Sequence, residues 1–209
     1  MKIPIAKEGA PFIAPLGILT LAFLAASMFW AALVLGLLFL FVLYFFRDPE
    51  RAITDDPKAV VSPADGKIVE ITREADPFEG KTYIRVSIFL SVFNVHINRI
   101  PIAGQIEKTR YNPGKFLAAF NHKASLDNEQ NTLMIRKENT EVLVKQIAGL
   151  IARRIVCWAK EGDRYQTGQR FGLIRFGSRV DLMVPEKTRL VIKHGDTVRG
   201  GSSIIGFLE

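Results

Sequence analysis

The segment LVIKHGDTVRGGSSIIGFL, residues 190–208, alternates short apolar runs with glycine-containing turns. Residues 195–196 (Gly-Asp) and 200–201 (Gly-Gly) have the composition of tight turns. Glycine adopts backbone conformations that other residues avoid, and aspartate bonds its neighbouring backbone. Ser202 and Ser203 then begin a last strand, so turn chemistry accounts for this glycine–serine pair. The segment predicts compact β-structure at this end of the chain.

A second segment near the start of the body completes the pattern. SPADGKIVEI, residues 62–71, carries Pro-x-Asp-Gly ahead of spaced apolar residues. Together, residues 62–71 and 190–208 resemble the opening and closing segments of biotinyl/lipoyl-like (hammerhead) barrel-sandwich domains. The resemblance implies a mainly β body of the barrel-sandwich type.

Short apolar runs bounded by glycine, proline, asparagine and aspartate indicate the strands of this body. We expect strands at residues 60–61, 67–72, 83–90, 104–111, 131–137, 141–147, 171–176, 179–183 and 189–192. The isoleucine and valine content of residues 148–158 favours a further strand. Residues 114–120 are the segment in which a helical period is visible.

The N-terminal region differs, because no charged side chain occurs between Ala10 and Phe46. A membrane span needs about 20 apolar residues, so residues 1–46 are predicted to be an α-helical membrane anchor and residues 47–209 a separate β-rich domain. Positive residues flank the run on both sides, and the positive-inside rule then places both flanks at the cytoplasmic face of the cell (inner) membrane. This favours a helical hairpin turning near Ser27, with one long tilted helix as the alternative.

Charge and cysteine content narrow the function classes. The net charge of +7 falls almost wholly on residues 47–209, which suits anionic lipid headgroups at a membrane. A basic helix and an aromatic RNA-binding motif are both lacking, so no nucleic-acid partner is expected. The single cysteine, Cys157, excludes an internal disulfide and lies among apolar residues as a small hydrophobic side chain. No metal site is predicted.

A different glycine–serine pair, Gly177-Ser178, interrupts the apolar stretch GLIRFGSRVDLMVP, residues 172–185. A glycine within a strand is typical of a bulge, but other motifs precede this pair. They are YFFRDPER, SPADG, FLSVFNVHINRIP, YNPGKF and FNHKASLDNEQN, in this order. Together with RFGSRVDLMVP around the pair, they resemble the phosphatidylserine decarboxylase family in its short membrane-anchored form, and the resemblance covers residues 44–208.

The resemblance implies that the chain cuts itself between Gly177 and Ser178. In that family the serine of such a pair, followed by an apolar stretch ending in a proline (here Pro185), attacks the carbonyl group of the glycine. Ester formation and β-elimination yield beta and alpha chains from one precursor. A pyruvoyl group, the cofactor of the enzyme, is left where Ser178 stood. Arg179 departs from the pattern, because long-form members carry a hydroxyl residue there.

The resemblance also assigns catalytic roles to His96 and Asp65. His96, in NVHINR, would act as base for Ser178 and as the acid that returns a proton to the substrate carbon. Asp65 would orient its ring. Long-form members carry a second histidine three residues after the first, where this chain has Arg99. The base for self-cleavage therefore stays open between His96 and His122.

The implied reaction is decarboxylation of phosphatidylserine to phosphatidylethanolamine, through a Schiff base between the lipid amine and the pyruvoyl carbonyl. Arg99, His122 and Lys123 are candidate ligands for the lipid phosphate, which needs cationic or N–H donors. His194 lies in the KHGD turn and is expected to be exposed. The family implies a possible homodimer and leaves open whether the substrate is a diacyl or an ether lipid.

Other function classes compete with this reading. A membrane-tethered barrel-sandwich adaptor without catalysis would keep an intact chain, and it leaves NVHINR and FNHKASLDNEQN unexplained. A biotin or lipoyl carrier needs a lysine at a hairpin tip, where this chain has GDTVRGG. A serine hydrolase of the α/β type needs a G-x-S-x-G elbow, and this sequence lacks one. The sequence therefore favours the decarboxylase.

Overall fold

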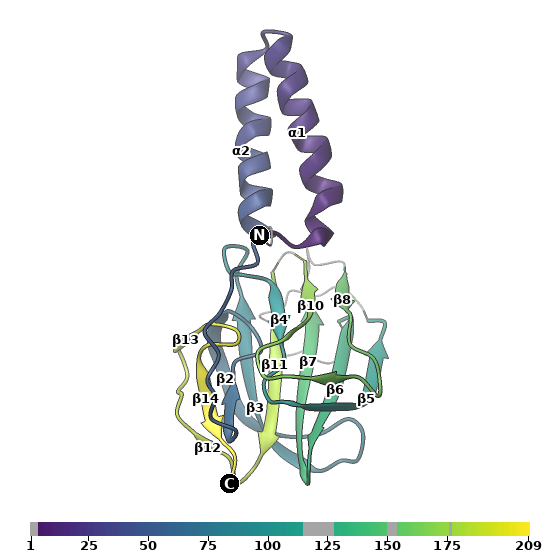
Figure 1. Ribbon diagram of the computed structural model, residues 1–209, viewed down its shortest axis with the longest axis vertical. Helices are drawn as coiled ribbons and strands as arrows, with labels where there is room; N and C mark the ends of the chain where they lie inside the picture. The colour runs from purple at the N-terminus through teal and green to yellow at the C-terminus, as the bar shows by residue number, and fades with distance from the viewer. Residues whose placement is uncertain (1–3, 115–127, 150–153, 176) are drawn as a thin grey trace. The chain divides into compact units, whose positions relative to one another are not determined.

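The computed structural model describes residues 4–114, 128–149, 154–175 and 177–209. The chain divides into two compact units, Met1–Glu50 and Arg51–Glu209. The first unit is helical, and the second consists of antiparallel β-strands joined by turns (Figure 1). The protein is thus mainly β with an N-terminal helical part. The helical period expected at residues 114–120 falls almost entirely outside the described residues.

The helical unit is a hairpin. Its elements are η1 (Lys7–Gly9), α1 (Ala10–Ala25) and α2 (Phe29–Phe45). The two α-helices lie side by side and antiparallel (Figure 1). The chain reverses between them at Ser27, whose φ is 57°. The open end is closed by the backbone, because Ala6 N donates to Phe46 O at 2.8 Å.

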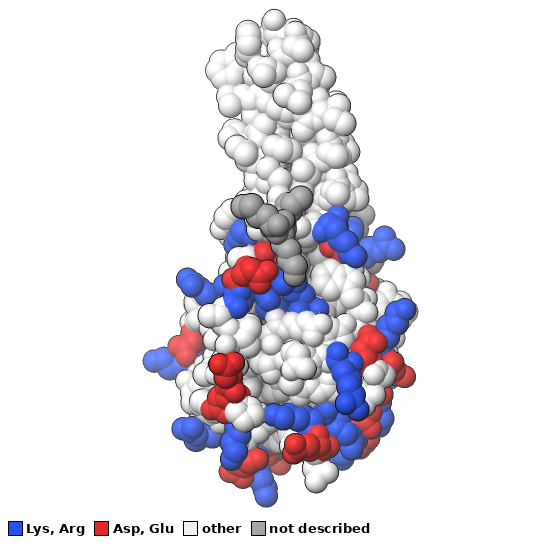
Figure 2. Space-filling model, viewed as in Figure 1, with Lys and Arg blue, Asp and Glu red and all other residues white. Residues whose placement is uncertain are grey.

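The surface of this hairpin is apolar. Trp30 is 82% exposed and Ile18 is 69% exposed. Figure 2 shows uncharged side chains over both helices, whereas charges of both signs are interspersed over the β-unit. By length and composition the segment Lys7–Ala25 could cross a membrane, and Phe29–Phe45 is a shorter apolar helix. An exposed apolar surface of this size indicates contact with lipid or another apolar partner.

The β-unit begins at residue 51. Its strands are β1 (Ala59–Val61), β2 (Gly66–Ala75), β3 (Thr82–Leu90), β4 (Ile97–Arg99), β5 (Gly104–Asn112), β6 (Gln130–Lys137), β7 (Thr140–Ala148), β8 (Ile155–Cys157), β9 (Arg164–Tyr165), β10 (Arg170–Ile174), β11 (Ser178–Pro185), β12 (Arg189–Leu190), β13 (Thr197–Val198) and β14 (Ile204–Phe207). They form an eight-stranded sheet, β13-β2-β3-β11-β7-β6-β5-β9, and two three-stranded sheets, β4-β10-β8 and β1-β14-β12.

The main core lies against one face of the eight-stranded sheet. Alternate residues of a strand point to opposite faces, so Val180 and Leu182 of β11 share this face with Ile88 and Val144 of the neighbouring strands. All four are fully buried in one apolar cluster. The opposite face carries a smaller cluster and several charged side chains. The members of that cluster are Tyr83, Met134, Leu143 and Met183, with Phe78 packed against them.

Two expected strand positions differ from the structure. Ser202 and Ser203 complete the turn before β14 instead of beginning the strand, because Arg199 N donates to Ser203 Oγ at 2.9 Å and so extends the turn. The strand expected over residues 148–158 is reduced, among the described residues, to the end of β7 and to β8.

Candidate active site

Ser178 is the first residue of β11, at the centre of the eight-stranded sheet. Its Cα pairs with Leu90 of β3 on one side and Ala148 of β7 on the other. Its side chain lies on the core face, as does that of Val180 two residues later. Ser178 is 0% exposed, and its Oγ has no hydrogen-bond partner among the described residues. An unpaired buried hydroxyl costs about 1–3 kcal/mol, so such a group in a folded protein requires an explanation, of which a catalytic role is one.

Gly177 stands where the chain passes from one sheet to another. β10 ends at Ile174 in a three-stranded sheet, and β11 begins in the eight-stranded sheet. The φ of Gly177 is +67°, a left-handed conformation that costs other residues roughly 1–2 kcal/mol. A Cβ built on Gly177 would meet no heavy atom within 4 Å. Backbone conformation therefore requires this glycine, which lies between β10 and β11, and Ser178 begins the second of these strands.

His96 is held close to this break by the backbone. Its carbonyl accepts a hydrogen bond from Ile174 N at 3.4 Å, four residues before Ser178. Its side chain is nearly buried, and Nδ1 lies 3.0 Å from the carbonyl oxygen of Asn94. A carbonyl oxygen can only accept, so Nδ1 carries the ring proton and Nε2 is the nitrogen that can take one up. The orientation of His96 suits a general base.

The carbonyl that orients His96 belongs to a closed turn. Ser91 N and Ser91 Oγ both donate to Asn94 Oδ1 at 2.8 Å, and Asn94 N donates back to Ser91 O at 3.0 Å. Ser91 directly follows Leu90, the partner of Ser178 in the sheet. The turn thus connects Ser178 and His96 through the end of β3. Sequence reasoning did not identify this role of Asn94.

Asp65 is bound to two other segments. Arg51 Nη2 donates to Asp65 Oδ2 at 2.8 Å and to Oδ1 at 3.0 Å, and Gly200 N donates to Oδ1 at 2.8 Å. The Asp65 and Arg51 side chains are only 12% and 11% exposed. Asp65 therefore connects its own segment, residues 62–71, to the chain around Arg51 and to the turn that contains Gly200. The described hydrogen bonds of Asp65 do not include His96, so its orienting role stays a prediction.

Of the three candidate phosphate ligands, the structure describes only Arg99. Arg99 is 4% exposed, and its Nη1 donates to Gly168 O at 3.0 Å. That position suits an arginine that holds a loop in place. His122 and Lys123 lie outside the described residues. His194 is exposed in a turn, as its sequence context predicts.

Arg179, the departure from the family pattern, points away from the core face. Its guanidinium pairs with Asp181, through Nε to Oδ1 at 2.9 Å and Nη2 to Oδ2 at 3.0 Å. Both residues are buried on the opposite side of β11 from the Ser178 side chain. The departure at residue 179 therefore falls on the sheet face opposite the Ser178 hydroxyl.

Sequence reasoning missed a row of buried amides near the serine. Asn131 Nδ2 donates to Gln146 Oε1 at 3.2 Å, and Gln146 Nε2 donates to Asn98 Oδ1 at 2.8 Å. Gln146 and Asn98 are 0% exposed. The available signal was an amide side chain inside an apolar strand pattern, as in HINR and VKQIAG.

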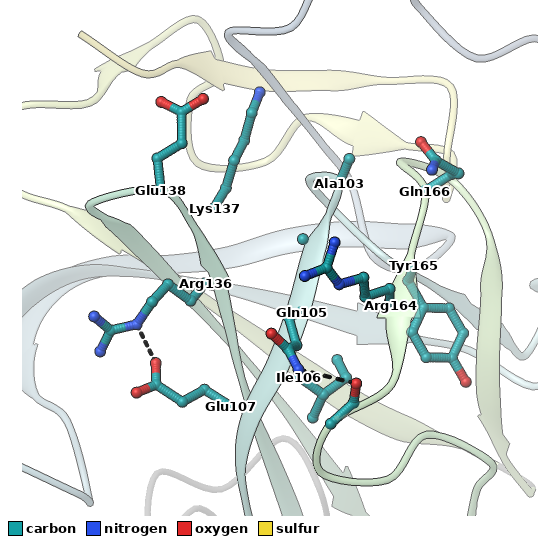
Figure 3. Close-up of a pocket in the computed structure, with 12 residues that line it drawn as sticks. Ala103, Gln105, Ile106, Glu107, Arg136, Lys137, Glu138, Arg164, Tyr165 and Gln166 are labelled. Carbon is teal, nitrogen blue, oxygen red and sulfur yellow. Dashed lines mark hydrogen bonds and ion pairs between the residues drawn. The ribbon is translucent and has the colours of Figure 1, made fainter.

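A pocket of about 760 Å³ lies elsewhere, between β5, β6 and β9. In Figure 3 the side chains of Arg164 and Lys137 border it, and Arg136 pairs with Glu107 at one side. None of the three proposed catalytic residues lines this pocket. It therefore contributes nothing to the candidate site.

Comparisons with known proteins agree with the motifs. The sequence model of the phosphatidylserine decarboxylase family matches residues 38–206. The phosphatidylserine decarboxylase proenzyme of Cupriavidus pinatubonensis is 46% identical over 207 residues, which cover 98% of this chain and 95% of that protein. The proenzyme of Desulfotalea psychrophila is 47% identical over 208 residues, 98% of this chain and 97% of that protein. That of Chlorobium phaeobacteroides is 44% identical over 209 residues, 100% of this chain and 94% of that protein. This chain belongs to the phosphatidylserine decarboxylase family.

Proposed function

We propose that the chain is a proenzyme that cuts itself at Gly177-Ser178 and then decarboxylates phosphatidylserine to phosphatidylethanolamine. The observation that carries the proposal is the buried hydroxyl of Ser178, which lacks a hydrogen-bond partner in the described part of the chain and directly follows a glycine with φ +67°. His96, with Nε2 able to accept a proton, is held to the same break by Ile174. The word proenzyme in the names of the similar proteins supports processing of the chain.

Self-cleavage begins at the Ser178 hydroxyl. Oγ attacks the Gly177 carbonyl carbon and passes its proton to His96 Nε2, because serine is a weak nucleophile unless a base activates it. The new C–O bond replaces the C–N bond, whose nitrogen takes up a proton, so an ester joins the two residues. Loss of the Ser178 Cα proton and departure of the Gly177 carboxylate then cut the chain. The dehydroalanine that remains hydrolyses to a pyruvoyl group and ammonia.

The surroundings of residue 178 fit this product. Among the described residues the hydroxyl that must be lost has no hydrogen-bond partner, and its position is shielded from solvent. A ketone there supplies an electron sink when carbon dioxide leaves the substrate. His96 then returns a proton to the substrate carbon, a task suited to a histidine near neutral pH. Asp65 contributes by fixing the segment that precedes β2.

The β-unit is proposed to be a barrel-sandwich of the biotinyl/lipoyl-like kind. Support comes from the opening and closing segments, which meet as the sequence pattern implies. β1 pairs with β14, Ser62 N donates to Ser203 O at 2.8 Å, and Gly201 N donates to Ser62 O at 2.8 Å. The two ends of the domain therefore close on each other.

The apolar hairpin is proposed to anchor residues 1–46 in the inner membrane, with the catalytic domain, residues 47–209, at the cytoplasmic face. Its uncharged surface and the positive residues at its two ends support this placement. A membrane anchor also suits a substrate that resides in the bilayer. The homodimer stays a prediction.

The test is the intact mass of the full-length protein under denaturing conditions. Cleavage predicts loss of the 23.4 kDa species and a C-terminal fragment of residues 178–209 with a blocked amino terminus. Ser178→Ala should leave one uncut chain without decarboxylase activity on phosphatidylserine vesicles, whereas Ser202→Ala should be cut normally. An uncut wild-type chain that still decarboxylates would contradict the mechanism.

A further inference from the structure

We infer that Asn98 donates a hydrogen bond to the Gly177 carbonyl oxygen while Ser178 Oγ attacks the carbonyl carbon, and that Gln146 positions Asn98 for this task. The inference rests on the proposed self-cleavage and adds an oxyanion donor to it. It starts from two buried polar atoms without a partner among the described residues, Ser178 Oγ and Asn98 Nδ2. One is the proposed nucleophile, and the other is a neutral N–H donor.

The two atoms belong to the same layer of the core. Gln146 pairs with Val180, and Ala148 pairs with Ser178, so the two pairs are neighbours on one face of the sheet. Residues two apart along a strand are separated by roughly 7 Å. Gln146 Nε2 bonds Asn98 Oδ1 at 2.8 Å, which places the Asn98 amide over the pair next to Ser178.

The direction of the amide row is set at its far end. Cys157 Sγ donates to Ala159 O at 3.6 Å, and Asn131 also hydrogen-bonds this thiol. With its proton committed to Ala159, the sulfur can only accept from Asn131 Nδ2. Burial raises the pKa of Cys157 and keeps the thiol protonated. Asn131 is therefore oriented with Nδ2 toward its partners.

From Asn131 the row runs in one direction. Asn131 Nδ2 donates to Gln146 Oε1, so Gln146 Nε2 must face Asn98 Oδ1. The remaining group, Asn98 Nδ2, is left as a donor at the end of the row. Room for this arrangement depends on Gly172, since a Cβ there would lie 3.0 Å from Gln146 Nε2 and 2.3 Å from Val156 O.

The chemistry explains why Asn98 Nδ2 has no partner among the residues that the structure describes. Attack by Ser178 Oγ converts the Gly177 carbonyl into a tetrahedral centre, and the electron pair of the C=O bond moves onto its oxygen. The negative charge that develops in the first step therefore lies on the Gly177 carbonyl oxygen. A donor that gains its partner only then stabilises the transition state more than the ground state. Losing one such donor typically costs about 10²–10³-fold in rate.

The test uses the full-length chain, synthesised with a short radioactive pulse in the presence of lipid vesicles, with cleavage followed by denaturing gel. Asn98→Asp keeps the shape and the acceptor for Gln146 but replaces the donor. We expect cleavage to slow at least 100-fold while the thermal unfolding midpoint stays within a few degrees. The matched control, His194→Ala at an exposed turn, should be cut at the wild-type rate.

Hydroxylamine separates this role from a later one, because it cleaves esters but not amides. An oxyanion donor acts before the ester forms, so stalled Asn98→Asp should resist hydroxylamine at neutral pH. Cleavage of the stalled chain by hydroxylamine would overturn the inference, as would a rate within threefold of wild type. If wild type itself is uncut, the proposed function fails, independently of Asn98.

A second variant decides the matter if Asn98→Asp does not fold. Gln146→Met keeps a side chain of similar length but removes its hydrogen bond to the Asn98 amide. We expect cleavage to slow about tenfold. The chains that are still uncut should resist hydroxylamine. Gln146→Glu, which still reaches Asn98, should slow cleavage less. Wild-type cleavage by folded Gln146→Met would overturn the positioning role.

Discussion

Asp65 and Arg51 form an ion pair in which a single guanidinium nitrogen, Nη2, lies 2.8 and 3.0 Å from the two carboxylate oxygens. Both side chains are close to nine-tenths buried. The pair joins the first residues of the β-unit to the segment that precedes β2. This contact defines a structural role for Asp65 that can be measured separately from an orienting role toward His96.

Asp65→Asn should destabilise the fold by about 3 kcal/mol, because it leaves Arg51 buried without its counter-charge. The double variant Arg51→Gln/Asp65→Asn should recover part of this loss of unfolding free energy, measured by urea denaturation of the two single variants and the double variant. If the role of Asp65 is structural, the extent of cleavage falls in parallel with stability in all three variants. Abolished cleavage in a stable Asp65→Asn chain, with Arg51→Gln still active, would instead establish the role toward His96.

His96→Ala should abolish self-cleavage with little loss of stability, because it removes the atom that takes the Ser178 proton. The measurement is the fraction of cut chain on a denaturing gel after expression. Normal processing of His96→Ala would assign the base to another residue, and His122→Ala would then be the next variant to examine.

Gly177→Ala and Gly172→Ala should fail for different reasons. No atom of the described residues lies within 4 Å of a Cβ at residue 177, so the alanine there is opposed by the left-handed conformation, about 1–2 kcal/mol, and the folded chain should be cut slowly. An alanine at residue 172 would stand 2.3 Å from Val156 O, so the chain should unfold more easily and remain uncut. Circular dichroism with gel analysis distinguishes the two. Equal stability of both variants would contradict this account.

Glu79→Gln should lower the unfolding midpoint at neutral pH. Hydrogen bonds from Lys108, and to a smaller extent from Lys81, lower the pKa of Glu79 to about 2. Because the folded pKa lies below the unfolded one, this stabilisation is complete above about pH 4.5 and is lost as pH falls toward 2. The difference from wild type should therefore shrink over that range. A constant difference down to pH 2 would contradict the ion-pair origin.

Removal of residues 1–50 should leave a β-unit that folds and cuts itself but no longer sediments with vesicles. The reason is that residues 51–209 form a compact unit with their own core. Sedimentation and intact mass on one preparation test both statements. Retained sedimentation in low and high salt would mean that the hairpin is not the main anchor.

The sequence predicted the parts of this molecule that depend on local pattern. Alternating β-branched residues marked most strands, and the absence of charge from Ala10 to Phe46 marked the helical unit. Motif context selected Ser178 over Ser202, and the structure places Ser202 in the turn between β13 and β14.

What could not be predicted depends on contacts between distant segments. The partners of Asp65 come from residues 51 and 200, and the amide row joins β4, β6 and β7. The change of sheet at Gly177 was hidden, because apolar residues continue on both sides of it. The orienting carbonyl of Asn94 belongs to the backbone, which carries no sequence signal.

β11 is hydrogen-bonded on both sides, and its first residue is the proposed source of the cofactor. A dissociable cofactor can be exchanged when it is damaged and replenished from solution. A reactive group built into the end of a central strand permits neither. On the proposed mechanism each molecule prepares its reagent once, and a side reaction that consumed the ketone would end its working life. The cell's capacity for the reaction would then depend on synthesis of new chains.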